Sequence, residues 1–321
     1  MTDEYLWDRS GEPDPEVAHL EQTLERLRWS GKHPSFERAA PAAARFAKKP
    51  WYVAAAAALV LGLASAFAVH RMHTLHPLTS WQLSSAGHSL SSVRAGQLIE
   101  TGPTGASIES AYVGKVDLDP DTRLRLISTR EDRHRLALEH GTIHALIWAP
   151  PTRFVVDTAA AKTVDLGCQY TLSVARNGQG FLTVELGWVA FQWNKVESFI
   201  PEGAACATQV GRGPDTPYFL DAPKALTKSL AEFDSTHNRQ ALTSVLQAAR
   251  PRDALTLWHL LQRTRGEEQV EVFNRFAGLV ALPPTVNRDG ILRGDSKTMD
   301  AAWDALQLGD TSWWREWKRD W

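Results

Sequence analysis

The chain has 321 residues, 22% of them charged, and a formal net charge of −2 at pH 7. This length is enough for more than one domain. The near-zero charge gives no argument for nucleic acid as a direct partner. Because no P-loop or G-x-G-x-x-G sequence precedes an expected helix, nothing supports nucleotide binding, and we expect no cofactor.

The first 50 residues change from acidic to basic, with acids from Asp3 to Glu25 and bases from Arg26 to Lys49. Asp14-Pro15-Glu16 predicts a helix start, with Asp as the N-cap and Pro at the first helical position. An apolar stripe then follows at helical spacing beside acidic residues. The stripe is Val17, Leu20, Leu24 and Leu27, and the acids beside it are Glu21 and Glu25. One short helix cannot build its own core, so it either docks on a cytoplasmic protein or is a marginal helix with a disordered tail. Residues 31–50 predict a linker.

The stretch from Trp51 to Val69 contains no charged residue and no proline. A helix of this length spans roughly 30 Å, which matches the hydrocarbon core of a bilayer. We interpret it as a single transmembrane helix. A buried core helix is the alternative, and a cleaved signal peptide is disfavoured because some fifty residues precede the stretch.

The charges beside this stretch predict its orientation. Arg38, Arg45, Lys48 and Lys49 precede it, whereas Arg71 is the only nearby cation after it. Because positive charge stays in the cytoplasm, residues before Trp51 are expected inside and residues after Val69 outside. The basic segment can also lie against the anionic headgroups of the lipid bilayer.

Three histidines, His70, His73 and His76, follow the expected span. Imidazoles bind zinc or copper, and a spacing of three places neighbouring histidines on one helix side. Successive steps of three drift around the helix, however, and Pro77 ends it. We therefore favour solvated histidines and predict no metal site, with a metal role left as the alternative.

From Trp81 to about Tyr218 the pattern changes to short apolar or alternating runs separated by Gly, Asp, Asn and Pro. Turn signals come every ten to fifteen residues, which predicts an all-β domain of many short strands. Gly141 and Gly187 are expected at turns between strands, where a positive φ is cheap only for glycine. We expect a β-solenoid or a jelly-roll-like sheet, which offers faces and edges to a partner rather than a catalytic cleft.

Five segments between about Ser107 and Gln209 carry a resemblance to a known family. They are VDLDPDTRL from Val116, LEHGTI from Leu138, FVVDT from Phe154, GCQYTL from Gly167 and VELGWV from Val184. Their order resembles the FecR domain, although Cys168-Gln169 replaces the usual Thr after the glycine. No secretin-like signalling domain follows, and residues 1–50 lack the His/Cys set of zinc-type anti-sigma factors.

This resemblance implies a single-pass protein of the bacterial inner membrane, with a cytoplasmic N-terminus and a periplasmic C-terminus. It further implies that the N-terminal helix regulates an extracytoplasmic-function sigma factor, as an anti-sigma factor or another kind of sigma regulator. An envelope protein or ligand would be sensed on the exported side.

The only two cysteines, Cys168 and Cys206, both fall in the expected exported part. In an oxidising compartment, two lone cysteines on neighbouring strands are expected to pair, so we predict a Cys168–Cys206 disulfide. The alternative is two buried thiols whose Cα atoms lie more than about 7 Å apart.

Beyond Pro223 the apolar spacing becomes helical, and breakers every fifteen to twenty residues predict antiparallel helical hairpins similar to HEAT repeats. The chain ends in a tryptophan-rich tail, Trp313, Trp314, Trp317 and Trp321. Such a tail either binds the outer leaflet or packs back on its own domain, and we favour the packing.

The sequence therefore predicts a mixed, multi-domain chain. Its parts are a cytoplasmic helix and linker (1–50), a transmembrane helix (51–69), a FecR-like β-domain (70–222) and a helical domain (223–321). No nucleophile elbow or paired carboxylate site supports an enzyme. Two functions remain: a transmembrane signalling protein that acts on a sigma factor, or an envelope scaffold that binds other exported proteins. Only the first function needs the acidic helix Pro15–Arg28.

Overall fold

The computed structural model describes His19, Leu24 and residues 80–85, 88–130, 132–194 and 196–309. The predicted span Trp51–Val69, the three histidines that follow it and the tryptophan-rich tail lie outside these residues. Within the described residues, no helix is both long enough and apolar enough to cross a membrane.

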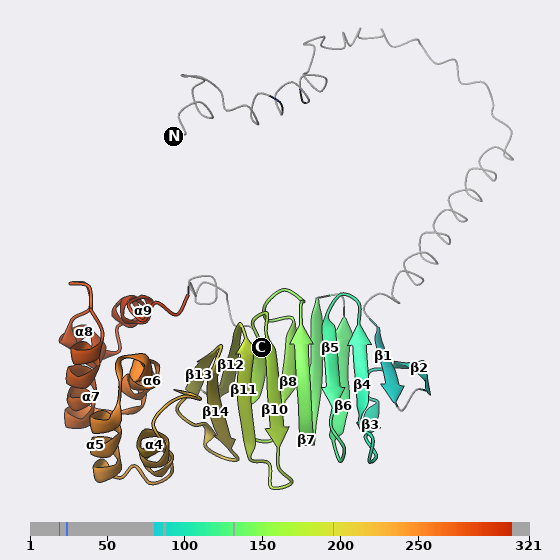
Figure 1. Ribbon diagram of the computed structural model, residues 1–321, viewed down its shortest axis with the longest axis horizontal. Coiled ribbons are helices and arrows are strands. Elements are labelled where there is room, and N and C mark those ends of the chain that lie inside the picture. The colour runs from blue at the N-terminus through green and yellow to red at the C-terminus, as the bar shows by residue number, and fades with distance from the viewer. Residues whose placement is uncertain are drawn as a thin grey trace, which may run out of the picture. The chain divides into compact units, whose positions relative to one another are not determined.

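Residues 81–219 form strands, and the helices follow them in the chain (Figure 1). The strands are β1 (Trp81–Ser85), β2 (His88–Val93), β3 (Leu98–Glu100), β4 (Ala106–Ser110), β5 (Gly114–Leu118), β6 (Arg123–Arg130), β7 (Arg133–Ile147), β8 (Phe154–Asp157), β9 (Lys162–Asp165), β10 (Gln169–Val174), β11 (Gly180–Leu186), β12 (Trp188–Trp193), β13 (Val196–Pro201), β14 (Ala204–Gln209), β15 (Gly213–Pro214) and β16 (Tyr218–Phe219).

The strands form two sheets that share β7. Sheet A has the order β2-β1-β4-β5-β7-β10-β11-β14, with β15 and β16 both paired to β14. Sheet B has the order β3-β6-β7-β8-β9-β12-β13. All of these pairs are antiparallel except β7–β8, which is parallel.

Strand β7 passes from one sheet to the other at Gly141. Residues before this glycine pair with β6 and β8 in sheet B, and residues after it pair with β5 and β10 in sheet A. Gly141 has φ +103°, and a Cβ there would collide with the backbone and side chain of Thr122. The Thr122 hydroxyl accepts a hydrogen bond from the N–H of Thr142 and so holds this corner in place. Gly141 therefore lies within a strand, at a corner rather than at the predicted turn.

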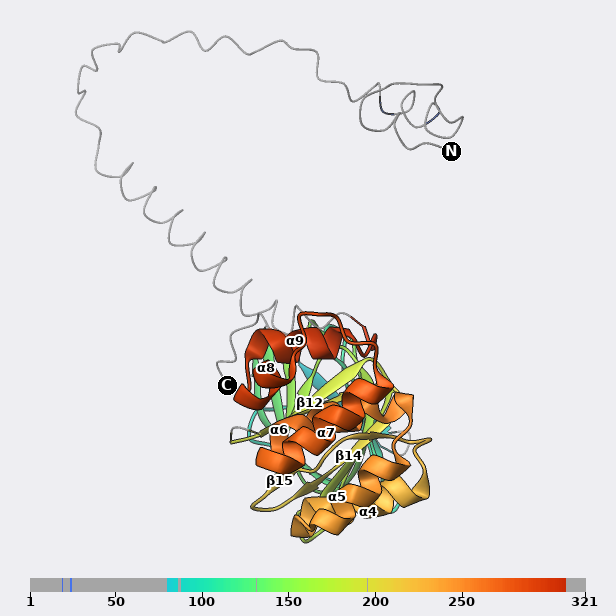
Figure 2. The ribbon, with the colours of Figure 1, turned by 90° about the vertical axis from the view of Figure 1, so that its left-hand side faces the viewer.

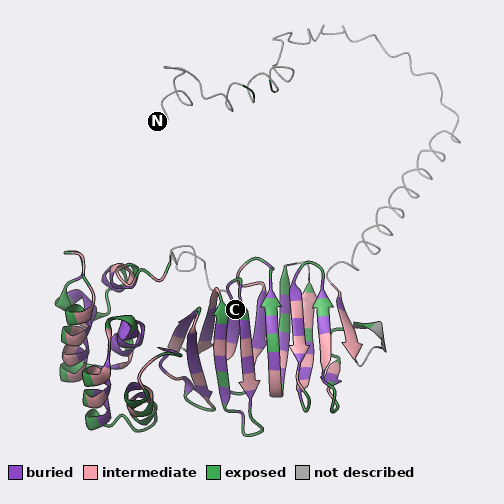
Figure 3. Ribbon diagram, in the orientation of Figure 1, coloured by how far each residue is buried: buried purple, intermediate pink, exposed green. Residues whose placement is uncertain are grey.

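Alternation of buried and exposed residues places one core between the two sheets (Figure 3). In β5, for example, Gly114, Val116 and Leu118 are buried, whereas the residues between them are half-buried. Alternation with a period of two is what a strand with one core-facing side requires. The largest fully buried side chains include Trp81, Tyr170 and Phe154.

The helices pack on the end of the β-structure near β12, β13 and β14 (Figure 1 and Figure 2). They are α4 (Lys224–Thr236), α5 (Arg239–Ala248), η3 (Pro251–Asp253), α6 (Ala254–Arg263), α7 (Gly266–Leu279), α8 (Arg288–Arg293) and α9 (Ser296–Asp304). The N-caps Asn238, Asn287 and Asp295 each accept a hydrogen bond from a backbone N–H in the first turn of their helix, as capping side chains do.

An aromatic cluster joins the helices to sheet B. The Trp303 ring of α9 lies 5.8 Å from the rings of Trp188 and Phe199, and 4.7 Å from that of Trp258. Beside this cluster, Nε2 of buried His259 accepts a hydrogen bond from the N–H of Phe199. The buried apolar residues of strands and helices consequently form one continuous cluster.

The structure confirms the expected run of short strands followed by helices. The antiparallel pairing fits the jelly-roll-like alternative better than a β-solenoid, in which strands of successive coils run parallel. The predicted boundaries at residues 50 and 69 stay predictions.

Candidate functional site

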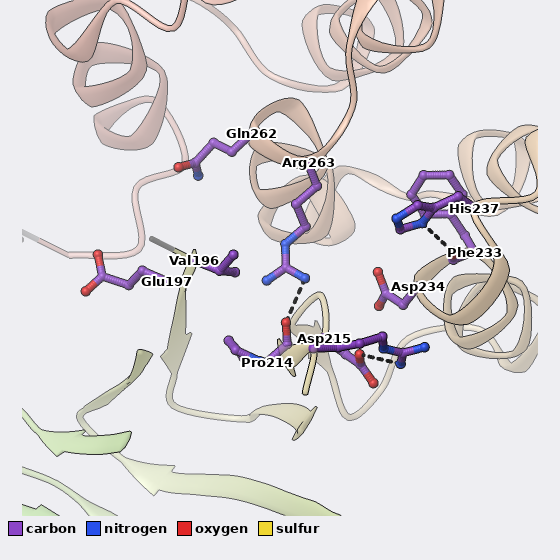
Figure 4. Close-up of a pocket in the computed structure, with 10 residues that line it drawn as sticks. Val196, Glu197, Pro214, Asp215, Phe233, Asp234, His237, Gln262 and Arg263 are labelled. Atoms are coloured by element: carbon purple, nitrogen blue, oxygen red, sulfur yellow. Dashed lines mark hydrogen bonds and ion pairs between the residues drawn. The ribbon is translucent and has the colours of Figure 1, made fainter. Parts of the chain in front are cut away.

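A cavity of about 420 Å³ opens between the end of sheet B and the helices (Figure 4). Strand β13 supplies Val196 and Glu197 at its first two positions, and the segment around β15 supplies Pro214 and Asp215. The C-terminal ends of α4 and α6 complete the wall. The cavity therefore exists only because the helices pack against these strands.

Arg263, the last residue of α6, extends into the cavity as a half-buried cation. Its guanidinium donates hydrogen bonds to the carbonyl oxygen of Pro214 at 2.9 Å and to the hydroxyl of Ser198 at 2.6 Å. Both of these acceptors are neutral. The guanidinium is thus fixed in position by β13 of sheet B and β15 of sheet A while it keeps its charge available to an occupant.

Two carboxylates lie across the cavity from this arginine. Asp234 is held by Thr216, whose N–H and hydroxyl each donate to one of its oxygens at 2.8 Å. Asp215 accepts a hydrogen bond from Arg212 at 3.2 Å. Burial and the nearby negative charge of Asp234 raise the pKa of Asp215, and the Arg212 charge opposes that rise.

His237 borders the cavity as the C-cap of α4. It adopts φ +53°, and its backbone N–H donates to the carbonyl oxygen of Phe233. This left-handed conformation ends the helix and turns the imidazole toward the cavity (Figure 4).

A polar ligand in this cavity would meet a positively charged hydrogen-bond donor, Arg263, and negatively charged acceptors, the two aspartates. The arrangement fits binding of a small polar molecule.

The predicted disulfide is wrong, because Cys168 and Cys206 are both free and buried. Cys206 lies opposite Leu182 of β11, whereas Cys168 precedes Gln169, which lies opposite Leu186. The two cysteines are therefore about five residues apart along the strands, roughly 17 Å, with β11 between them. A disulfide needs Cα atoms within about 7 Å of each other.

Each thiol has a different partner. Cys168 donates to the carboxyl of Asp165, and Cys206 donates to the carbonyl oxygen of Asp215 at 3.1 Å. Burial raises the pKa of both thiols far above the ordinary value for cysteine, so both are unreactive at neutral pH.

The predicted partner-binding face falls almost entirely outside the described residues. Leu24 is helical and 56% exposed, while Val17, Leu20, Glu21, Glu25 and Leu27 are not described. Among the described residues, no group of three or more His, Cys, Asp or Glu side chains could hold a metal ion.

Sequence reasoning missed the cavity because its residues are far apart in the chain. Glu197 and Arg263 are separated by 66 positions, and neither belongs to a local motif. The only available signal was the change from strand to helix spacing near Pro223, because such junctions often hold pockets.

Comparison with known proteins places the chain in no established family. No known family profile matches it, and no curated protein matches it. Two crystal structures, at 1.65 and 2.50 Å resolution, of a "putative anti-sigma factor" from Parabacteroides distasonis ATCC 8503 are similar to it, with 15% and 16% identity and a TM-score of 0.34. Each match covers 42% of this chain and 64% of that one, so the chain spans less than two thirds of its neighbour. At this TM-score the likeness does not establish a shared fold.

Proposed function

We propose that this chain is a single-pass regulator of the bacterial inner membrane that passes an envelope signal to a cytoplasmic extracytoplasmic-function sigma factor. Its N-terminus lies in the cytoplasm, its β-structure and helices lie in the periplasm, and it performs no catalysis. The exported part binds an envelope protein or ligand.

The observation that supports this proposal is where the FecR-like segments lie in the structure. The five FecR-like segments fall on β5–β6, β7, β8, β10 and β11–β12, which belong to the two sheets joined by β7. Gly187 between β11 and β12 has φ +77°, and a Cβ there would collide with the carbonyl oxygen of Gly167. The glycines of these motifs therefore have a structural reason to be glycine.

The sigma-factor part of the proposal rests on the N-terminal stripe and its acids. Sigma factors contact promoter DNA through cationic helices, and an acidic amphipathic helix can occupy such a surface. Its leucines would enter an apolar groove, and Glu21 and Glu25 would face basic side chains at the rim.

The test is copurification of sigma factors with the full chain from membranes. Leu20→Asp combined with Leu24→Asp should abolish capture, because two charges would have to be desolvated in the interface. Charge reversal at Glu21 and Glu25 should instead slow association and change its salt dependence.

A matched control adds the same two charges to the opposite side of the expected helix. Ala18→Asp combined with Gln22→Asp should leave capture of the sigma factor intact. If the leucine variant still captures what the wild type captures, the docking face is wrong. If the wild type captures no sigma factor, the envelope-scaffold alternative replaces this proposal.

A further inference from the structure

The turns at one end of the two sheets form an edge that carries exposed aromatic side chains. This tether-side edge comprises the β4–β5 turn, the segment after β7 and the end of β11 (Figure 1). Tyr112 in the β4–β5 turn is 60% exposed, Trp148 after β7 is 48% exposed, and Leu186 at the end of β11 is 55% exposed. Among the exposed large hydrophobic side chains of the described residues, Trp148 is the only tryptophan and Tyr112 the only tyrosine.

The chain enters the β-structure at this same edge. Gln82 of β1 pairs with Glu109 of β4, and this antiparallel register places Ser80 level with Ala111, next to Tyr112. Ten residues separate Val69 from Ser80, and ten residues reach at most about 35 Å. If Trp51–Val69 spans the bilayer, this edge of the β-structure is tied close to the membrane surface.

The side chains at the edge have the chemistry of the membrane interface. The indole N–H of Trp148 donates to the carbonyl oxygen of Ala111 at 2.9 Å. The remaining, solvent-exposed part of the indole ring is therefore apolar. Tyrosine and tryptophan prefer the headgroup level of a bilayer. Leu146, 43% exposed, and Leu186 flank Gln169 on the outer face of sheet A and continue the apolar surface.

Charge contributes little at this edge. Charged residues of both signs lie at this end of the sheets, and their charges sum to zero: Arg130, Glu131, Asp132 and Arg133 at the β6–β7 turn, Arg153 after β7 and Glu185 next to Leu186. An electrostatic attraction to anionic lipid is therefore not expected here, and a contact with the membrane would be made by apolar and aromatic groups.

We propose that the tether-side edge, through Tyr112, Trp148 and Leu186, rests in the headgroup layer of the outer leaflet of the membrane that anchors the chain. This inference rests on the single-span topology of the proposed function. A few side chains suffice because the tether holds them at a high effective concentration near the surface. The contact fixes the orientation of the β-structure, and it keeps the opposite turns and the cavity beside Arg263 open to the periplasm.

The test places one fluorophore on the full chain in phosphatidylcholine vesicles that contain lipid with a nitroxide on its headgroup. Ala111→Cys puts the label beside Tyr112, and Asn177→Cys puts it in the β10–β11 turn at the opposite end of the sheets. The two native thiols are buried and stay unlabelled. We expect the label at position 111 to be quenched at least about threefold more than the label at 177.

Two variants connect that quenching to the aromatic side chains. Tyr112→Ser combined with Trp148→Ser should reduce quenching at position 111 to the level seen at position 177. Phe181→Ser, which removes an exposed aromatic ring near the opposite end of β11, should leave it unchanged. High salt should also leave the quenching unchanged, because the edge carries little net charge.

The outcomes separate this inference from the proposed function. If alkaline carbonate extracts the full chain from membranes, the single-span topology fails. If the chain stays inserted but the labels at 111 and 177 are quenched equally, the inference fails alone. A label at 111 that is shielded from aqueous iodide yet not quenched by the lipid would show a protein on this edge, which also overturns the inference.

Discussion

Asp165 is a carboxyl group buried at the end of β9, between the two sheets. One of its oxygens accepts a hydrogen bond from the N–H of Gly167 at 2.8 Å, and the Cys168 thiol donates to the other. Burial raises the pKa of Asp165 to about 7, more than these hydrogen bonds lower it. The carboxyl is therefore neutral in the fold below neutral pH, whereas in the unfolded chain it ionises near pH 4.

This difference sets the sign of a pH dependence. Asp165 stabilises the fold fully below about pH 4, and that contribution is lost as pH rises toward 7, by at most about 1.4 kcal/mol per pH unit. Buried His134 and His259, whose pKa values burial lowers to about 4 and about 3, act in the opposite direction. Because they must stay neutral in the fold, they destabilise it as pH falls below about 6.5.

We predict that Asp165→Asn removes the Asp165 contribution to this pH dependence. The amide keeps the acceptor for Gly167 but cannot ionise, so the variant should gain stability relative to the wild type between pH 5 and pH 8. Urea unfolding of the detergent-solubilised chain, followed by tryptophan fluorescence, measures the difference. Subtracting the wild-type free energy of unfolding from that of the variant at each pH cancels the contributions of His134 and His259. Exposed Asp289→Asn is the control, and an equal shift in that variant would contradict the prediction.

At the scale of elements, the strands were predictable and their arrangement was not. Alternation such as that of Gly114, Val116 and Leu118 marks a strand with one core-facing side, and the change of spacing after Pro223 marks the start of the helices. The passage of β7 from sheet B to sheet A was not predictable. It depends on the contact between Gly141 and Thr122, which lies in another segment of the chain. The cavity likewise depends on α4 and α6 reaching β13, which no local pattern specifies.

The β7 corner gives a prediction with a built-in control. Gly141→Ala should destabilise the fold by roughly 2–5 kcal/mol, because it adds both a strained backbone and a collision with Thr122. Gly211→Ala also has a positive φ, +81°, but a Cβ there meets nothing within 4 Å. It should cost only about 1–2 kcal/mol of backbone strain. Equal losses in urea unfolding would show that the contact with Thr122 does not matter.

At the scale of the whole molecule, the described strands and helices share one continuous apolar cluster, which includes Trp303 and Phe199. A signal received at the cavity beside Arg263 would therefore be received by strands and helices together. In the proposed function, the route of that signal to the cytoplasm depends on the topology of residues 1–79, in which the apolar stretch predicts the span and the flanking charges predict its orientation.

That topology can be tested with reporter fusions and a charge series. Green fluorescent protein joined to the N-terminus of the full chain should fluoresce, and alkaline phosphatase fused after residue 90 should be active, because cations precede Trp51. Neutralising Arg45, Lys48 and Lys49 to Gln should lower the phosphatase activity, since the orientation depends on cations within about 15–20 residues of the span. Arg26→Gln with Arg28→Gln lies beyond that distance and should change nothing. An inactive phosphatase after residue 90, together with loss of fluorescence from the N-terminal reporter, would reverse the orientation and place the acidic helix outside the reach of any sigma factor.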